Sequence, residues 1–338
     1  MNLKNSDNSI KSSIIFGVGN PLIDILINAT DNDLDSLNMT KGTMELVTEN
    51  RQQEILNYFA NIQPIYSPGG SAPNTIIASS GLGISSYITG KIGKDEFGDK
   101  YLNRLNQYGV RSGIVQGNGC TGSSIILVTP DGERTMNTHL GLCQEFCSND
   151  LDVEILSKSK FLYFTGYMWD TDSQKASIRE AITIAKDYKI KIVFDVADPF
   201  VVHRNKFEFI KMIQNDIDIV FANESELKIL FGIEDINESI NQLMKYIHFG
   251  GIKLGKRGSI VFCNKEKYKI HPEELKALDT TGAGDMYAAG FLSSLAKGND
   301  YFSAGEIAVR LAEQIIQIQG AQLKKNHITK LKLEYFNR

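Results

Sequence analysis

Short apolar runs alternate along the chain with longer segments in which apolar residues recur at helical spacing. In the second half the apolar runs are KFLYFTGYMW, KIVFDVAD, DIVFAN and GGIKLG, and predicted helices separate them, including one over 173–188 and one that begins at Glu224. Strands that are apolar along their whole length and separated by helices are typical of a parallel sheet covered on both faces. We therefore expect an α/β fold with a doubly wound, mainly parallel sheet and helices on both faces.

The first half continues this alternation but adds a region rich in β-structure. The run GCTGSSIILVTPDGERTMNT is typical of a hairpin, because Pro130, Asp131 and Gly132 separate two β-rich stretches. The early strands and this hairpin do not fit easily into a parallel sheet. We therefore place them in a small β-rich lid formed by inserted segments at about 25–48 and 113–137. Before the hairpin, strands are predicted over 13–18, 23–27 and 85–93, and helices over 49–59, 74–81 and 99–109.

Composition and charge exclude several function classes. The chain has 338 residues, 42% of them hydrophobic, and a formal net charge of -4 with both signs interspersed, so neither nucleic acid nor an anionic membrane is an expected partner. The four cysteines form no CxxC pair and lack a matching set for zinc, which favours reduced structural thiols. The N-terminus shows no signal-peptide core or membrane span, so we expect a cytoplasmic protein. Monomer and homodimer both stay open, because lid strands can be covered by a helix or by the lid of a partner.

The segment ALDTTGAGDMYAAGFLSSLAKG, residues 277–298, places a glycine-rich turn directly before a predicted helix. Glycines let backbone N–H groups approach an anion closely, so Gly282, Ala283 and Gly284 are candidates for cradling a transferring phosphoryl group. Asp285 would repel that anion unless it accepts the proton of the attacking hydroxyl, which makes it a candidate general base. The structural alternative is a tight turn with a capping aspartate. Neither a P-loop nor a GxGxxG after the first strand is present, which disfavours classical NTPases and dehydrogenases.

Four motifs together resemble the ribokinase-like (PfkB) family of sugar and nucleoside kinases. DTTGAGD at 279–285 and GKIGKDEFG at 90–98 resemble its C-terminal and N-terminal signatures. GGSAPN at 69–74 and NESE at 223–226 are similar to its substrate-side glycine turn and its NxxE motif. The order and spacing of the motifs agree with the family over nearly the whole chain. The resemblance implies one ribokinase-like kinase domain over 1–338 that uses ATP and Mg²⁺ to phosphorylate a small molecule.

The resemblance also implies roles for individual residues. Asp285 would be the catalytic base beside an anion hole formed by the glycine turn, and Arg134 in the lid hairpin would reach the transferred phosphate. Asn223 and Glu226 would organise magnesium, mostly through its waters. The nucleotide-binding candidates are Lys253, Gly255, Gly258 and Thr280. Two structural alternatives remain open, because Asn223 and Glu226 have the spacing of a helix capping box and Arg134 has the setting of a solvated hairpin arginine.

On the substrate side, GNPLIDI at 19–25 resembles the opening of the adenosine kinases of this family. The resemblance implies that Asn20 and Asp24 bind ribose hydroxyls, and a carboxylate can accept two hydrogen bonds from a vicinal diol. Tyr167 matches an aromatic residue that stacks on adenine, while packing in the core or lid remains the alternative for Tyr167 and Trp169. The sequence departs from animal adenosine kinases at Pro73, at Thr281 and in the lid hairpin. The remaining substrate-binding candidates are Gly69, Gly70, Ser71 and Asn74.

The sequence therefore predicts an ATP-dependent kinase of a primary hydroxyl, first of all the 5′-hydroxyl of a nucleoside such as adenosine. A sugar kinase acting on ribose, fructose or a keto-deoxy sugar acid is the alternative within the family. A non-catalytic ligand-binding module of the same fold is the alternative from another class, which the intact Asp285 and glycine turn disfavour.

Overall fold

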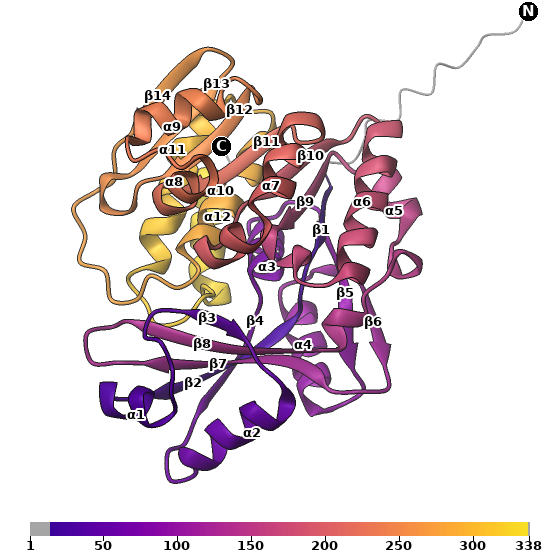
Figure 1. The fold of residues 1–338 in the computed structure, drawn as a ribbon. Helices are drawn as coiled ribbons and strands as arrows, with labels where there is room; N and C mark the ends of the chain where they lie inside the picture. Colours follow the sequence, from indigo (N-terminus) through magenta and orange to yellow (C-terminus); the bar gives the residue numbers. More distant parts are fainter. Residues whose placement is uncertain (1–13, 337–338) are drawn as a thin grey trace, which may run out of the picture.

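A nine-stranded sheet forms the larger part of the computed structural model, which describes residues 14–336 (Figure 1). In sheet order its strands are β14 (Glu266–Ile270), β13 (Ser259–Cys263), β12 (Phe249–Lys253), β11 (Ile219–Asn223), β10 (Lys191–Asp195), β9 (Phe161–Thr165), β1 (Ile15–Val18), β5 (Ser86–Gly93) and β6 (Arg111–Gly117). The strands from β12 to β6 are parallel, while β13 and β14 are antiparallel at one edge. The predicted doubly wound, mainly parallel sheet is confirmed.

Helices cover both faces of this sheet and enclose two hydrophobic cores. One face carries α3 (Ser71–Gly81), α4 (Glu96–Gln107), α10 (Ala283–Lys297), α11 (Tyr301–Ile315) and α12 (Lys325–Tyr335). The other carries α5 (Val153–Ser157), α6 (Asp172–Asp187), α7 (Pro199–Asn215), α8 (Glu224–Phe231) and α9 (Ile236–Leu243). Because successive side chains of a strand point to opposite faces, β9 supplies Tyr163 to the first core and Leu162 and Phe164 to the second. No helix within residues 14–336 has the length and apolar character needed to cross a membrane.

A second sheet, of five strands, lies across one end of the larger body (Figure 1). Its strands, in order, are β3 (Met44–Leu46), β8 (Arg134–Gly141), β7 (Thr121–Val128), β2 (Leu22–Asn28) and β4 (Ile65–Gly69). The helices α1 (Asp31–Ser36) and α2 (Glu49–Tyr58) lie on its outer side. Along β2, Ile23, Ile25 and Ile27 are buried, while Leu22 and Asp24 alternate with them and face a cavity. We call this sheet with α1 and α2 the lid.

The lid has a different extent from the expected segments at 25–48 and 113–137. It also contains α2, β4, the start of β2 and the end of β8. The assignment of the residues from 113 to 117 to the lid was wrong, because they belong to β6, which pairs with β5 in the large sheet. Grouping the strand at 13–18 with the lid was also wrong, since β1 is buried along its length between β9 and β5.

Candidate active site

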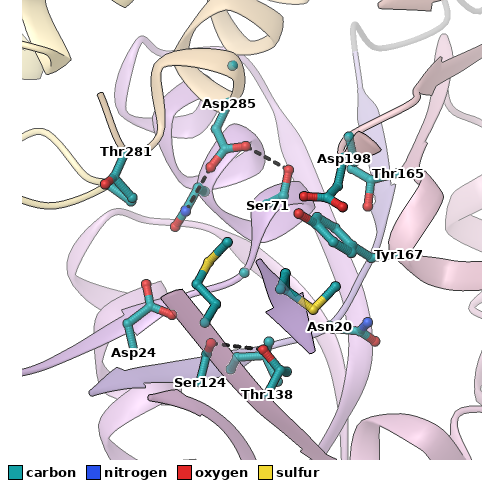
Figure 2. A pocket seen from close by; sticks show the side chains of 18 of the residues that line it. Asn20, Asp24, Ser71, Ser124, Thr138, Thr165, Tyr167, Asp198, Thr281 and Asp285 are labelled. Carbon is teal, nitrogen blue, oxygen red and sulfur yellow. Dashed lines mark hydrogen bonds between the residues drawn. The ribbon is translucent and has the colours of Figure 1, made fainter. Parts of the chain in front are cut away.

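A cavity of about 570 Å³ lies between the lid and the loops that follow the parallel strands (Figure 2). The loop after β1, the ends of β9 and β11 and the loop after β10 line one side, and β2, β3, β7 and β8 of the lid line the other. The glycine turn before α10 and the start of α3 complete the wall. Open α/β sheets bind ligands at this edge, because strand ends and helix N-termini converge there.

The glycine turn positions the first residues of α10 at the cavity. Gly282 has φ +73°, and a Cβ at this position would lie 2.6 Å from the carbonyl oxygen of Ala321, so only glycine fits. In the part of the chain that the structure describes, no side chain caps the N-terminus of α10, which leaves its first N–H groups open to an anion. The Ala283 N–H is an exception because it donates to the Thr280 carbonyl at 3.2 Å. Gly282, Gly284 and Thr280 line the cavity and Ala283 does not.

Asp285 is held at the cavity by two residues of α3 (Figure 2). Ser71 Oγ donates to Asp285 Oδ1 at 2.6 Å, and Asn74 Nδ2 donates to Oδ2 at 2.9 Å. Burial raises the pKa of Asp285 to about 6, and the two hydrogen bonds work in the opposite direction because they stabilise the charged form. The result is an oriented carboxylate whose pKa suits proton transfer near neutral pH.

Asp24 faces the same cavity from the lid strand β2 (Figure 2). Within residues 14–336 no group donates a hydrogen bond to its carboxylate. Burial and the nearby charge of Asp285 raise the pKa of Asp24 to about 7, while Arg134 lowers it. Gly69 does not line the cavity, but a Cβ there would overlap the Asp24 carboxylate, so glycine is needed for this side chain to fit. Asp24 therefore offers free acceptor atoms to a ligand.

A buried charge pair lies behind the glycine turn. Lys253 Nζ, at the end of β12, contacts Asp195 Oδ1 and Oδ2 at 3.0 and 3.1 Å. A Cβ on Gly284 would lie 3.3 Å from Lys253 Nζ, which places the ammonium group directly against the first turn of α10. Burial lowers the pKa of Lys253, but the charges of Asp195 and Glu226 outweigh that effect and raise it. Lys253 is therefore a cation next to the open N–H groups, although it does not itself line the cavity.

Asn223 and Glu226 form a reciprocal capping box at the start of α8. Asn223 N and Nδ2 donate to the two Glu226 carboxylate oxygens at 2.7 and 2.6 Å, and Glu226 N donates to Asn223 Oδ1 at 2.8 Å. Asn223 lines the cavity, whereas Glu226 is fully buried. Burial raises the pKa of Glu226 to about 7. Within the described residues, no three His, Cys, Asp or Glu side chains are grouped to hold a metal ion.

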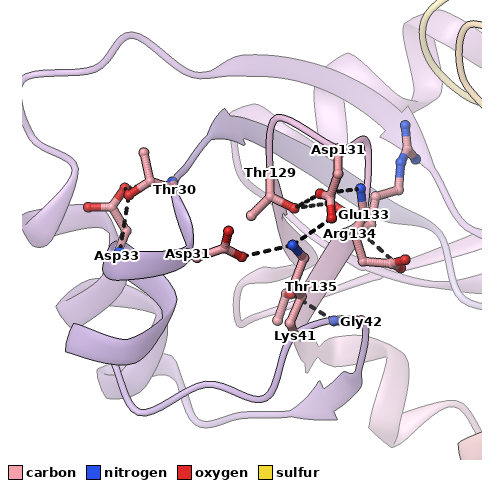
Figure 3. Close-up of polar contacts among 10 residues, drawn as sticks. All are labelled: Thr30, Asp31, Asp33, Lys41, Gly42, Thr129, Asp131, Glu133, Arg134 and Thr135. Atoms are coloured by element: carbon pink, nitrogen blue, oxygen red, sulfur yellow. Dashed lines mark hydrogen bonds and ion pairs between the residues drawn. The ribbon is translucent and has the colours of Figure 1, made fainter.

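Arg134 connects the lid to the loop that carries the glycine turn. Its guanidinium forms an ion pair with Asp279, and the two side chains are only 17% and 6% exposed, so Arg134 is not a solvated hairpin residue. Asp279 also accepts hydrogen bonds from Thr281 N and Oγ1 at 2.8 and 2.6 Å and from Gly320 N at 2.8 Å. Figure 3 shows the hairpin tip beside Arg134, where Lys41 bridges Asp31 and Asp131 at 2.8 and 2.7 Å.

The two aromatic candidates after β9 have different surroundings. Tyr167 lines the cavity, and burial raises its pKa well above the ordinary value. Trp169 lies outside the cavity lining, where it stacks on Phe164 with ring centroids 6.2 Å apart and donates from Nε1 to Glu208 at 3.0 Å. Trp169 therefore packs in the core and does not face the cavity. Both residues belong to a short 3-10 helix, Gly166–Trp169.

The cavity gathers most of the residues that the sequence singled out. Asn20, Asp24, Gly70, Ser71, Asn74, Arg134, Tyr167, Asn223, Thr280, Gly282, Gly284 and Asp285 line it, whereas Gly69, Glu226, Lys253, Gly255, Gly258 and Ala283 do not. Sequence reasoning missed Asp195 and Asp198, which follow the apolar part of β10, and also the lid pair Ser124 and Thr138, whose hydroxyls lie 2.8 Å apart. The polar ending DVAD after a buried strand was a signal that could have identified the two aspartates.

Comparisons with known proteins agree with this geometry. Residues 44–328 match the family described as pfkB family carbohydrate kinase. The structure of adenosine kinase from Sinorhizobium meliloti is similar with a TM-score of 0.89 at 30% identity, covering 96% of this chain and 99% of that one. Adenosine kinase of Saccharomyces cerevisiae is 26% identical over 335 residues, which are 92% of this chain and 97% of the yeast protein. A protein of Archaeoglobus fulgidus named "Uncharacterized sugar kinase" is 26% identical over 245 residues, 72% of this chain and 96% of its own length.

Proposed function

The chain belongs to the pfkB family of carbohydrate kinases and is an ATP-dependent kinase, and from this premise we propose that it phosphorylates the 5′-hydroxyl of a nucleoside, with adenosine as the first candidate. The family match confirms the resemblance carried by the four sequence motifs. The placement of Asp285 supports the proposal most directly. Its carboxylate is oriented by Ser71 and Asn74 at an uncapped helix N-terminus, and it shares one cavity with the free carboxylate of Asp24.

In the proposed reaction Asp285 accepts the proton of the substrate hydroxyl as that oxygen attacks the γ-phosphorus of ATP. The open N–H groups at the start of α10 stabilise the negative charge on the transferring phosphoryl group. The ammonium group of Lys253 lies behind the turn and the guanidinium of Arg134 on the lid side, each paired with a carboxylate, of Asp195 and of Asp279. Asp24 holds two neighbouring hydroxyls of the substrate, so that the attacking oxygen is directed at the phosphorus.

The nucleotide would lie along the glycine turn and the loop after β12. Thr280 lines the cavity on this side, and Lys253, Gly255 and Gly258 belong to the strand end and loop next to it. Magnesium neutralises phosphate charge when it is bound with ATP, and it keeps most of its waters. Asn223 and Glu226 fit an indirect role, because their side-chain atoms already bond to each other and would meet the ion through water.

The lining of the cavity favours a nucleoside over a simple sugar. Besides Tyr167, six apolar side chains of the lid line the cavity, between polar ones such as Asp24, Ser124 and Arg134: Leu22, Met44, Leu46, Ile126, Met136 and Leu140. A purine has a broad apolar face to bury against such side chains, whereas a monosaccharide requires polar partners on most of its atoms.

A substrate screen tests the proposal. The purified protein is supplied with ATP and Mg²⁺ together with adenosine, inosine, guanosine, ribose, fructose or a keto-deoxy sugar acid, and kcat/KM is measured for each. We expect the highest kcat/KM with adenosine. Asp285→Asn protein, purified in the same way, serves as the control for contaminating kinases. A higher kcat/KM for ribose, fructose or the sugar acid would reject the nucleoside assignment and support a sugar kinase.

A further inference from the structure

Gln174 in α6 is a fully buried residue outside the cavity lining and outside every motif considered above. It is the third residue after the helix cap Thr171, and Thr171 Oγ1 accepts a hydrogen bond from Gln174 N at 3.3 Å. A glutamine at this position normally completes a capping box by reaching back to the backbone N–H of the cap. The Gln174 side chain instead points into the protein, which indicates a use other than helix capping.

The Gln174 amide makes two hydrogen bonds that fix its orientation. Its Nε2 donates to the backbone carbonyl of Cys143 and to Asn20 Oδ1, both at 2.7 Å. A carbonyl can only accept, so the group of Gln174 that faces Cys143 must be the NH₂ group. The same NH₂ group faces Asn20, and the Asn20 atom in contact with it must therefore be the oxygen.

This arrangement turns the NH₂ group of Asn20 toward the cavity. Asn20 lines the cavity, and no residue within 14–336 accepts a hydrogen bond from its Nδ2. Nδ2 is also absent from the fully buried atoms that lack a partner, so it keeps contact with the cavity space. A ligand therefore meets Asn20 as a hydrogen-bond donor.

This orientation of the Gln174 amide lowers the stability of the folded protein. Gln174 Oε1 is one of two buried side-chain atoms in the described residues that have no hydrogen-bond partner. Turning the amide over would place Oε1 against two acceptor oxygens and would be worse. A buried unsatisfied acceptor costs stability, and an apolar residue of similar length would avoid that cost. The glutamine is therefore better explained by what it does to Asn20 than by packing.

We propose that Gln174 is a positioning residue for substrate selection: it holds the Asn20 amide with its NH₂ group toward the cavity, so that the bound substrate must present a hydrogen-bond acceptor there. A hydroxyl, ether oxygen or ring nitrogen meets this requirement, whereas a group that can only donate does not. The inference depends on the proposed function only for the choice of substrate.

A double-mutant cycle tests this role with the substrate of highest kcat/KM in the screen. The variants are Asn20→Ala, Gln174→Met and the two combined. Because Gln174 acts through Asn20, each single substitution should raise KM about tenfold, the effect of one hydrogen bond, and the double variant should be no worse than Asn20→Ala. Any change in kcat should likewise be no larger in the double variant than in Asn20→Ala, because both substitutions act through the same group. Ser177→Ala, one turn along α6 and bonded only to Phe146 and Ser173 carbonyls, should leave KM unchanged.

Additive effects in the cycle, or an unchanged KM in Gln174→Met, would overturn the positioning role. A second measurement needs no substrate and separates this inference from the proposed function. In side-chain amide NMR spectra, assigned with the same variants, the Gln174 NH₂ protons should exchange slowly with solvent and the Asn20 NH₂ protons quickly. Slow exchange at Asn20 with fast exchange at Gln174 would mean that the amides are oriented the other way, and the proposal would be rejected whichever substrate the enzyme uses.

Discussion

Ser71 Oγ donates a 2.6 Å hydrogen bond to Asp285 Oδ1 across a sequence separation of 214 residues. The bond joins the first turn of α3 to the first turn of α10, and Asn74 binds the other carboxylate oxygen from the same face of α3. Two motifs that are far apart in the chain thus form a single site. Since both carboxylate oxygens are bound, Asp285 has one defined orientation toward the cavity.

This contact predicts the pH dependence of the reaction. Asp24 and Asp285 both act in their charged forms, and burial raises the pKa of Asp24 to about 7, so kcat/KM should begin to fall near pH 7. The fall should steepen below about pH 6, because burial raises the pKa of Asp285 to about 6 and a protonated Asp285 cannot accept a proton. The hydrogen bond from Ser71 lowers this pKa, and Ser71→Ala should therefore move the acid limb to higher pH. The check is a kcat/KM profile of both proteins. Ser80→Ala on the same helix should leave the acid limb in place, because within residues 14–336 the Ser80 hydroxyl bonds only to the Tyr108 and Gly109 carbonyls.

Asp24→Asn should raise thermal stability while it lowers activity. Because the pKa of Asp24 is raised to about 7 in the folded protein, ionisation favours the unfolded chain from about pH 4 upward. The gain in Tm should be largest above pH 7, shrink as the pH falls and vanish near pH 4. The loss of the charged diol acceptor should reduce kcat by about a hundredfold through misplacement of the hydroxyl.

Thermal unfolding of wild type and Asp24→Asn at pH 8 and pH 4 measures the stability part. Asp33→Asn is a control of opposite sign, because hydrogen bonds from Thr30 lower the pKa of Asp33. A Tm gain for Asp24→Asn that is the same at both pH values would show that burial of the charge is not its cause.

Gly282→Ala should destabilise the protein more than Gly298→Ala. Both glycines have a positive φ, +73° and +94°, so both substitutions carry the strain of about 1 kcal/mol expected for alanine in that region. A Cβ on Gly282 would also lie 2.6 Å from the Ala321 carbonyl oxygen, whereas no atom of residues 14–336 lies within 4 Å of a Cβ on Gly298. Denaturant unfolding of both variants measures the difference. Equal losses would mean that the turn relaxes around the new methyl group.

Tyr167→Ala should weaken the use of adenosine mainly through KM. Stacking on a base contributes about 1–3 kcal/mol and lies away from the reacting hydroxyl, so KM should rise about tenfold or more while kcat changes little. Free ribose has no base and should be indifferent to the substitution. Steady-state kinetics with both substrates make the comparison. Trp169→Phe, in the core beside Phe164, should leave KM for adenosine unchanged, and a similar rise in this variant would assign the effect to packing.

The sequence predicted the large sheet because fully buried strands and amphipathic helices have different hydrophobic periodicities. It could not assign strands to sheets. RSGIVQG in β6 pairs with β5, and the predicted lid boundary at 113 falls inside that strand. Pairing depends on contacts between residues separated by a whole helix, and such contacts leave no local pattern.

Site residues that belong to a sequence motif could be predicted, whereas those outside the motifs were harder to predict. Asp285, Ser71 and Asn74 come from glycine-rich motifs, and the structure places them in contact. Gln174 comes from an ordinary helix start, and its link to Asn20 depends on how α6 packs against the loop after β1. The sequence allows Arg134 to be either a phosphate ligand or a solvated residue, and its ion pair with Asp279 arises only when the lid and the glycine turn meet.

Asp285 is the base that activates the nucleoside hydroxyl in the proposed reaction. Phosphoryl transfer from ATP to adenosine by wild type and Asp285→Asn measures this role most directly. Asparagine has nearly the same shape, so Asp285→Asn should fold, bind ATP as wild type does, and lose about a hundredfold or more in kcat. ATP binding is measured on the same preparations to confirm that the site is intact. Near-normal turnover in Asp285→Asn, with adenosine as substrate, would contradict the account.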